Sequence, residues 1–479
     1  MDWARAGLNI GGDILAAGLG PVMGADVAPR IVYALSVLLP VVGVMALNRA
    51  LFGGGHWWLI APLVVAWQRT ALAGFMNFQL GLGLALLAAS AEPAMTSRPL
   101  WLKLVARAVA GCVILLFHPF AALMYAGLVF GFSAGPDLAW LRDARALRSR
   151  TVAAVLAVLA VAAPCAVIIA LAPNPVPPSD TLMSWGRMDL IGRYNVITTG
   201  FQSYVPSFDL LTMVALAGIV SVAAWQRRLQ VHAGLLLLGL GFLLVSPLVP
   251  AHIGGAGWVD RRLPVMAVLV LVAAVRPNLE VSAPTLRVLA GLLLSIALLR
   301  TGEVATAWAG TARDLGSIRT AVAYMPVGAR LVTVADDPAD RSDAPFGRYL
   351  RGHPMYWNYP SLAVRWRHAF VPNLFTQSGQ QPLRVAASID PISVPFGAPP
   401  GVAALARPSA KDPQYMRHWR SCFDYVLVLN ADVAPAAAAS VPVRELQLVR
   451  DEGFAELYRN PRASRAACTT ALKGLPLRG

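Results

Sequence analysis

Residues 151–172 read TVAAVLAVLAVAAPCAVIIALA, an apolar run without a single charged residue. A spanning α-helix needs about 20 such residues to cross the hydrocarbon core of a bilayer. The whole chain has this character, because 57% of its 479 residues are hydrophobic and only 14% are charged. Soluble proteins carry about 25% charged residues. We therefore predict a polytopic α-helical membrane protein.

The apolar segments occupy the first 300 residues, after which the hydropathy falls and stays low. They lie at 28–46, 57–67, 71–89, 101–117, 118–132, 151–172, 208–225, 231–250, 263–275 and 286–299. Several are short, and 57–67 suits either a spanning helix or a bent or re-entrant segment. We predict about ten spans within residues 28–300, an external N-terminal segment at 1–27, and an extracytoplasmic α/β domain at 301–479.

The C-terminal region has the pattern of a small soluble α/β domain. An amphipathic helix is predicted over 304–324, and Pro and Gly mark the connections that follow it. The predicted strands are 330–334, 383–388, 425–429, 445–449 and 454–458.

The four cysteines fall into two pairs. Cys112 and Cys165 lie inside apolar runs, where we expect them to pack as small hydrophobic side chains. Cys422 and Cys468 lie in the polar C-terminal domain. In an oxidising compartment they would either form one disulfide or remain two free thiols, and spacing does not decide between these.

Basic residues in the short loops orient the chain, because cytoplasmic loops are enriched in Lys and Arg. Three loops agree, marked by Arg98, Lys103 and Arg107, by Arg142, Arg145, Arg148 and Arg150, and by Arg227 and Arg228. Alternation from them places 173–207, 251–262 and the C-terminal domain outside the cytoplasm. An even number of spans then places residues 1–27 outside as well. That segment has no secretory signal, so we expect the true start to lie upstream with one more spanning helix, the alternative being a miscounted short span.

Asp260, Arg261 and Arg262 lie in a short outer loop, against the usual charge bias. Ionisable residues at such depth are costly and mark functional sites. A guanidinium offers permanently charged, bidentate hydrogen bonds to phosphate. We therefore predict an anionic ligand here. An internal ion pair or contact with lipid head groups are the alternatives.

Other polar residues at the predicted outer ends of spans could line one cavity with this cluster. The ones we select are Arg69, Asn77, His118 and Arg193. Each also has a structural explanation: Arg69 could reach lipid head groups, His118 could cap a helix before Pro119, and Asn77 could form a cross-helix hydrogen bond. The long connection 173–207, which contains Arg193, is predicted to be a structured lid.

Several function classes lack support in the sequence. The net charge of +15 lies largely in orienting loops rather than in a basic arm, so no nucleic-acid partner is predicted. There is no Walker loop, no Gly-x-Ser-x-Gly elbow and no dinucleotide fingerprint. His118 has no His or Glu at the spacing of a metal-ligand pair, so no metal site is predicted from the residues.

Four features together resemble a known superfamily. They are Gly74-Phe-Met-Asn-Phe-Gln-Leu-Gly81, His118-Pro119, Asp260-Arg-Arg-Leu-Pro264, and the C-terminal domain with Phe423-Asp-Tyr-Val-Leu-Val428 and Leu457-Tyr-Arg459. With them the chain resembles the GT-C superfamily of integral membrane glycosyltransferases. The likeness covers nearly the whole chain, and its motifs are diffuse.

The resemblance implies a transferase of the bacterial inner membrane. It would move a sugar from a polyprenyl-phosphate donor in the lipid to a cell-envelope glycan, lipid or protein outside the cytoplasm. Arg261 or Arg262 would hold the lipid phosphate. The catalytic carboxylate, a general base or metal contact, belongs to the first outer loop, so it would lie upstream of Met1 or be Asp2. No cofactor is implied for certain, and a divalent metal is left open.

Two other classes of function compete with this interpretation. One is a transporter or flippase for an anionic lipid-linked substrate, although the sequence has no paired halves or internal symmetry. The other is a non-catalytic membrane scaffold that displays the C-terminal domain.

Overall fold

The computed structural model describes residues 7–137, 143–172, 183–253, 256–338, 341, 344–376, 381–433 and 441–473. The chain divides into two compact units, Ala4–Val304 and Ala305–Gly479, the second together with Met1–Trp3. We call them the helical unit and the sheet unit and describe each by itself.

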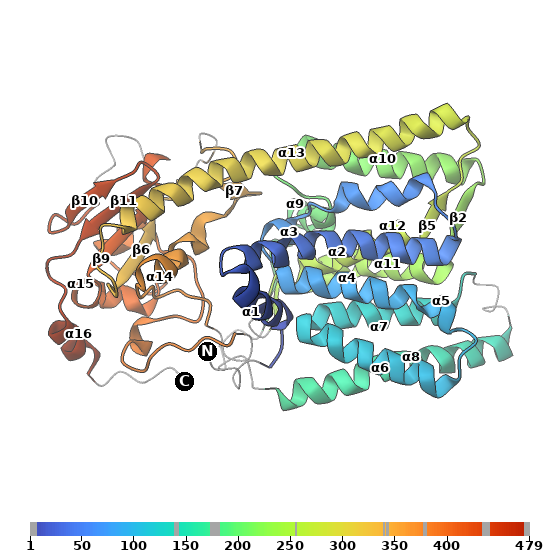
Figure 1. Cartoon of the computed structure of the whole chain (residues 1–479), viewed down its shortest axis with the longest axis horizontal. Coiled ribbons are helices and arrows are strands. Elements are labelled where there is room, and N and C mark those ends of the chain that lie inside the picture. The colour runs from blue at the N-terminus through green and yellow to red at the C-terminus, as the bar shows by residue number, and fades with distance from the viewer. Residues whose placement is uncertain are drawn as a thin grey trace. The chain divides into compact units, whose positions relative to one another are not determined.

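The helical unit is a bundle of long, nearly antiparallel helices (Figure 1). Its main helices are α1 (Gly11–Met23), α2 (Val27–Phe52), α4 (Met76–Ser90), α6 (Leu100–Phe117), α7 (Pro119–Ala134), α8 (Ala144–Leu171), α10 (Pro206–Trp225), α11 (Ala233–Val245), α12 (Val259–Ala273) and the first part of α13 (Ala283–Val322). Shorter elements join them, namely η2 (Trp57–Val65), α3 (Arg69–Leu72), α5 (Glu92–Met95), α9 (Leu190–Ile197), η4 (Thr198–Gly200) and η5 (Ser246–Leu248).

Within the described residues, six helices are long and apolar enough to cross a membrane, and two further apolar helices are shorter. This confirms the prediction of a polytopic helical membrane protein. The segment at 57–67 is not a regular spanning α-helix, since its residues Trp57–Val65 form η2, a 3-10 helix of nine residues that contains Pro62. This agrees with the predicted alternative of a bent or re-entrant segment. The segment at 263–275 corresponds to α12, whose side chains are nearly all buried within the unit.

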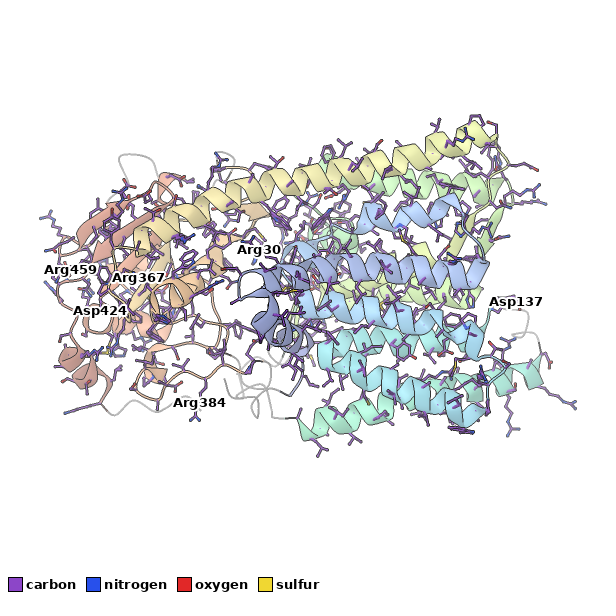
Figure 2. The ribbon with its side chains drawn as sticks, viewed as in Figure 1. Arg30, Asp137, Arg367, Arg384, Asp424 and Arg459 are labelled. Carbon is purple, nitrogen blue, oxygen red and sulfur yellow. A yellow bond between two sulfur atoms is a disulfide. The ribbon has the colours of Figure 1, made fainter. Side chains whose placement is uncertain are left out.

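The two ends of the helical unit are marked by Arg30 and Asp137, which lie at opposite ends (Figure 2). At the Asp137 end, β2 (Leu229–Val231) pairs antiparallel with β5 (Val275–Pro277). There the Asn48 amide donates to the carbonyl of Ala273 at 2.9 Å, which joins the end of α2 to the end of α12. At the Arg30 end, α4, α7, α10 and α12 begin, and this is the end that carries the candidate site.

The sheet unit is built on four strands in the order β10-β11-β9-β6. They are β6 (Leu331–Ala335), β9 (Tyr425–Leu429), β10 (Gln447–Asp451) and β11 (Ala455–Arg459). β6 and β9 are parallel, and the other pairs are antiparallel. Side chains of β9 alternate between two buried cores, with Leu427 and Leu429 on one face and Val426 and Val428 on the other.

Helices cover both faces of this sheet. The last turns of α13 and α14 (Leu362–Arg367) contribute to the first core, and α15 (Trp419–Cys422) and α16 (Arg465–Leu472) contribute to the second. The structure joins Cys422 to Cys468 through a disulfide, which links α15 to α16. Cys112 and Cys165 are free thiols in the helical unit. The predicted α/β character of the C-terminal region is confirmed.

Two sequence predictions for the second half of the chain are wrong. Residues 383–388 form no strand, because 383–386 have no regular secondary structure and 387–388 belong to a turn. The helices predicted at 286–299 and 304–324 are a single helix, α13, of 40 residues. The polar residues between them, which lower the hydropathy, bond sideways to other elements and leave the helix uninterrupted: Arg300 bonds to Asp209 and Glu303 to the backbone N–H of Val205.

Candidate anion site at the Arg30 end of the helical unit

Arg262 lies in the first turn of α12 inside a box of aromatic rings. Its Cζ is 5.0 Å from the ring of Phe120, 5.3 Å from Phe75 and 5.8 Å from Phe78. The residue is only 7% exposed, and its Nε has no hydrogen-bond partner. Within the described part of the chain, no carboxylate forms an ion pair with it. Its charge is therefore offset by ring faces alone.

His118 shares this aromatic box. Its ring is 5.1 Å from Phe78 and 5.8 Å from Phe120. Its Nδ1 accepts a hydrogen bond of 3.1 Å from the Phe120 N–H, which makes it the N-cap of α7. A neutral ring that accepts at Nδ1 carries its proton on Nε2. The residue thus has the capping role that a structural histidine would have, and it also lies beside Arg262.

A second part of the site centres on Trp258. The Cζ of Arg69 is 5.0 Å from its ring and that of Arg261 is 5.4 Å away. Phe75 lies 5.3 Å from Trp258 and so connects this part to the box around Arg262. Three of the four guanidinium groups predicted for the site therefore lie around one continuous group of aromatic side chains.

The backbone at Trp258 is held in an uncommon conformation. Its φ of 59° places it in the left-handed region, where a bulky residue is strained. The next residue, Val259, donates its N–H to the Ala251 carbonyl at 3.0 Å, which closes the loop before α12. No side chain caps the N-terminus of α12. The strain is stored at the point where the loop delivers Arg261 and Arg262 to the site.

The charges around the start of α12 are poorly balanced. Asp260 is 5% exposed and its Oδ1 has no hydrogen-bond partner, and it forms no ion pair with another described residue. Two arginines also lie at the positive end of the helix dipole, where cations are disfavoured. This position favours a bound anion, because the positive end of the helix dipole and the two guanidinium groups lie together.

Arg69 is held by a network that the sequence did not indicate. Its Nη1 donates to Oε1 of Gln202 at 2.9 Å. Gln202 in turn donates to the Asn195 carbonyl at 2.8 Å and to the Thr198 hydroxyl at 2.9 Å. Arg69 is 6% exposed, so it lies inside the protein and does not extend to lipid head groups.

Asn77 makes a structural cross-link. Its Oδ1 accepts from the Gly12 N–H at 2.5 Å, and its Nδ2 donates to the Asn9 carbonyl at 2.6 Å. Both bonds fix the start of α1 against α4. These two contacts are the cross-helix hydrogen bonds expected of a structural Asn, and the amide also interacts with the carboxylate of Asp13.

Asp13 is a candidate functional residue to which the sequence analysis gave no role. It lies in the first turn of α1, one residue after Gly12, and its Oδ2 is buried without a hydrogen-bond partner. Burial raises the pKa of Asp13 above its ordinary value of 3.8. Asn77 fixes this turn, and its neighbours Phe75 and Phe78 face Arg262. The sequence feature that could have identified Asp13 is an acidic residue directly after Gly11-Gly12, at the start of a helix.

The predicted lid is described in part, because 173–182 lie outside the described residues. β1 (Met183–Ser184) pairs with β3 (His252–Ile253), so the lid is attached to the loop before α12. Arg193 donates from Nε to the Met188 carbonyl at 3.0 Å, within its own segment. The structure does not bring its guanidinium to the rings that surround the other arginines.

Asp2 lies outside the described residues. Among the described residues, no group of three or more His, Cys, Asp or Glu side chains could hold a metal ion. We therefore assign no residue to a metal.

Comparisons with known proteins give one likeness. No protein-family model and no curated protein sequence matches the chain. Among solved structures, the chain is similar to ArnT from Cupriavidus metallidurans in the apo state, with 13% identity and a TM-score of 0.47, over 94% of this chain and 87% of that one. A likeness at this level does not assign a function.

Proposed function

We propose that the protein is a membrane glycosyltransferase of the GT-C type, which transfers a sugar from a polyprenyl-phosphate donor to an acceptor outside the cytoplasm. The observation that carries the proposal is Arg262, which is buried among aromatic rings and forms no ion pair with a described carboxylate, while Arg69 and Arg261 bring further positive charge to the adjoining ring of Trp258. A buried cation that lacks a paired carboxylate is expensive, so a protein that keeps one needs it for an anionic ligand. The phosphate of a membrane lipid has the matching charge.

The aromatic walls support the same ligand. Phe75, Phe78 and Phe120 exclude water from around Arg262, and an electrostatic contact is stronger where the effective dielectric constant is low. In the transfer step, the bond from the sugar carbon to the phosphate oxygen breaks, and negative charge grows on the departing polyprenyl phosphate. Guanidinium groups already fixed in place stabilise that charge without reorganisation.

The acceptor must lose a proton in the same step. Its hydroxyl oxygen bonds to the sugar carbon, and the hydroxyl proton passes to a general base. Asp13 is the carboxylate that we propose for this role, since it is fixed by the α1–α4 contact and has a free buried oxygen. Asp2, the residue that the superfamily resemblance suggests, is the alternative base.

A binding experiment tests the anion site directly. Purified protein in detergent is titrated with polyprenyl phosphate or with the neutral polyprenol, and stabilisation against heat is measured. We expect the wild type to prefer the phosphate by at least about tenfold, and Arg262→Met to lose this preference because one charged hydrogen-bond donor is gone.

Arg276→Met serves as the matched control, because Arg276 is a half-buried arginine at the Asp137 end that donates to the Phe52 carbonyl at 2.8 Å. It should keep the preference for phosphate. Equal affinity of the wild type for both lipids, or an unchanged preference for the phosphate in Arg262→Met, would overturn the anion site. Phosphate binding without release of sugar from any lipid-linked donor would instead favour a flippase.

We further propose that the sheet unit faces the outside of the bacterial inner membrane. The basic loops at the Asp137 end support this orientation. Cysteine placed at Ala410, which is exposed in the sheet unit, should react with a membrane-impermeant maleimide in intact spheroplasts. Arg98→Cys, exposed at a predicted cytoplasmic loop, should react only after lysis. The reverse pattern would reject the orientation.

A further inference from the structure

Arg300 donates four hydrogen bonds from its two terminal nitrogens, and it was not among the residues predicted for the site. It is 1% exposed and lies in α13. Its Nη1 donates to Oδ1 of Asp209 at 2.9 Å and to the Thr212 hydroxyl at 3.3 Å. Its Nη2 donates to the carbonyls of Trp67, at 2.5 Å, and Phe201, at 2.8 Å.

Those two carbonyls lie next to the anion site along the chain. Trp67 precedes Arg69 by two residues, and Phe201 directly precedes Gln202, the residue that accepts the hydrogen bond from Arg69. One nitrogen of Arg300 therefore bridges the two backbone segments whose side chains meet in the Arg69–Gln202 bond.

The bridge is itself fixed. Asp209 accepts from the Ser203 N–H at 3.0 Å and from the Ser203 hydroxyl at 2.5 Å, which holds the carboxylate against the same loop. Glu303, one turn further along α13, accepts from the Val205 N–H at 2.7 Å. Both sides of the loop 201–205 are thus attached to one rigid helix.

We infer that Arg300 is a positioning residue for the lipid-phosphate site: by clamping the Trp67 and Phe201 carbonyls it fixes Arg69 against Trp258 in the geometry that receives the phosphate. This inference rests on the proposed function. Lysine in place of Arg300 keeps the charge, but it has a single nitrogen and lacks the planar fork of a guanidinium. It therefore cannot bond to Asp209 and to both carbonyls at once.

The test compares Arg300→Lys with Arg107→Lys. Arg107 forms a bidentate pair with Glu92, through bonds of 3.0 and 2.7 Å, at the Asp137 end of the same unit. Both variants should unfold at lower temperature than the wild type. Only Arg300→Lys should lose affinity for polyprenyl phosphate, by about tenfold, the scale of one charged hydrogen bond. Its affinity for neutral polyprenol should not change.

A second variant covers the case in which Arg300→Lys does not fold. The double variant Arg300→Met/Asp209→Asn removes both charges and keeps an oxygen that accepts from Ser203, so no buried charge is left unpaired. It should show the same loss of affinity for the phosphate. Wild-type preference for phosphate in whichever Arg300 variant folds would overturn the positioning role.

Arg262→Met separates the two proposals. If it loses the preference for phosphate while the Arg300 variants keep it, the anion site stands and the clamp is rejected. If Arg262→Met binds phosphate as the wild type does, both are rejected.

Discussion

Replacing Arg262 with methionine should make the ligand-free protein as stable as the wild type or more stable, and should at the same time abolish its stabilisation by polyprenyl phosphate. Methionine keeps the apolar stem of the side chain out to about the position of Nε, and its thioether packs well against aromatic rings, although the contacts of Cζ with Phe75, Phe78 and Phe120 are lost. The variant removes the buried charge and its hydrogen-bond donors.

The expected change in the free energy of unfolding follows from two opposing contributions. Three ring contacts at 5.0–5.8 Å favour the guanidinium, each by about 0.5–2 kcal/mol depending on desolvation. Taking the charge out of water costs several kcal/mol, and replacing buried charges with apolar side chains is commonly neutral or stabilising by about 1–4 kcal/mol. We expect Arg262→Met to change the free energy of unfolding of the ligand-free protein by between zero and about +2 kcal/mol.

The assay is thermal unfolding in one detergent, at one protein concentration and one scan rate, because unfolding of such proteins is often irreversible. Each kcal/mol corresponds to a shift of about 2–4 °C for a domain of 150–250 residues. A ligand at 100 times its Kd adds about 2.7 kcal/mol to the wild type. The order of melting temperatures should therefore invert: the variant is equal or higher without polyprenyl phosphate and lower with it.

Two results would refute the reasoning. A loss of more than about 2 kcal/mol in ligand-free Arg262→Met would show that the guanidinium has a structural role, as expected for a bonded charge. An unchanged shift with polyprenyl phosphate would show that Arg262 does not meet the ligand. Neutral polyprenol, added at the same concentration, controls for effects of the lipid tail.

Three further predictions concern residues with a different chemistry. Asp13→Asn should abolish sugar transfer without loss of polyprenyl-phosphate binding, and retained transfer in the variant would exclude Asp13 as the base. Only the ionised carboxylate acts as the base, and burial raises the pKa of Asp13 above 3.8. The wild-type transfer rate should therefore rise with pH and reach its half-maximum above that value. Arg348→Met should destabilise the sheet unit by about 3–5 kcal/mol in thermal unfolding, because it leaves the buried Asp314 carboxylate without its ion-pair partner and also removes the pair with the more exposed Asp432; a loss under 1 kcal/mol would contradict this. The double variant Cys422→Ser/Cys468→Ser should lower the free energy of unfolding by up to about 4 kcal/mol, the loop-closure value for a separation of 46 residues. Four free thiols in the unreduced, denatured wild type would show that the disulfide does not form.

The sequence was sufficient for the helical architecture because a spanning helix is a local property. Apolar length and charge placement identify α8 or α10 without knowledge of what surrounds them. The errors occur where tertiary contacts override that local signal. α13 continues through Arg300 and Glu303 because both find partners on neighbouring segments, and no hydropathy profile contains those partners.

The candidate site was predicted only in part for the same reason, because tertiary contacts are not visible in the sequence. Charge bias and alternation of spans were enough to select Arg261, Arg262 and His118, since these depend only on chain order. The aromatic box around Arg262 was present in the sequence as Phe75 and Phe78, but its role depends on how α4 packs against α12. Trp258 carries no sequence signal for a left-handed backbone, which is usual for Gly or Asn and rare for Trp.

A count of partners separates structural from functional arginines in this chain. Arg300 and Arg348 are buried and meet both carboxylates and neutral oxygen acceptors, so their charges are compensated by the protein itself. Arg262 is also buried, yet it faces aromatic rings and forms no ion pair with a described carboxylate. Compensation is an equilibrium requirement, because a buried charge without it destabilises the fold. On this reasoning the compensating negative charge comes from outside the described residues, which is the role that the proposed function gives to the phosphate of a membrane lipid.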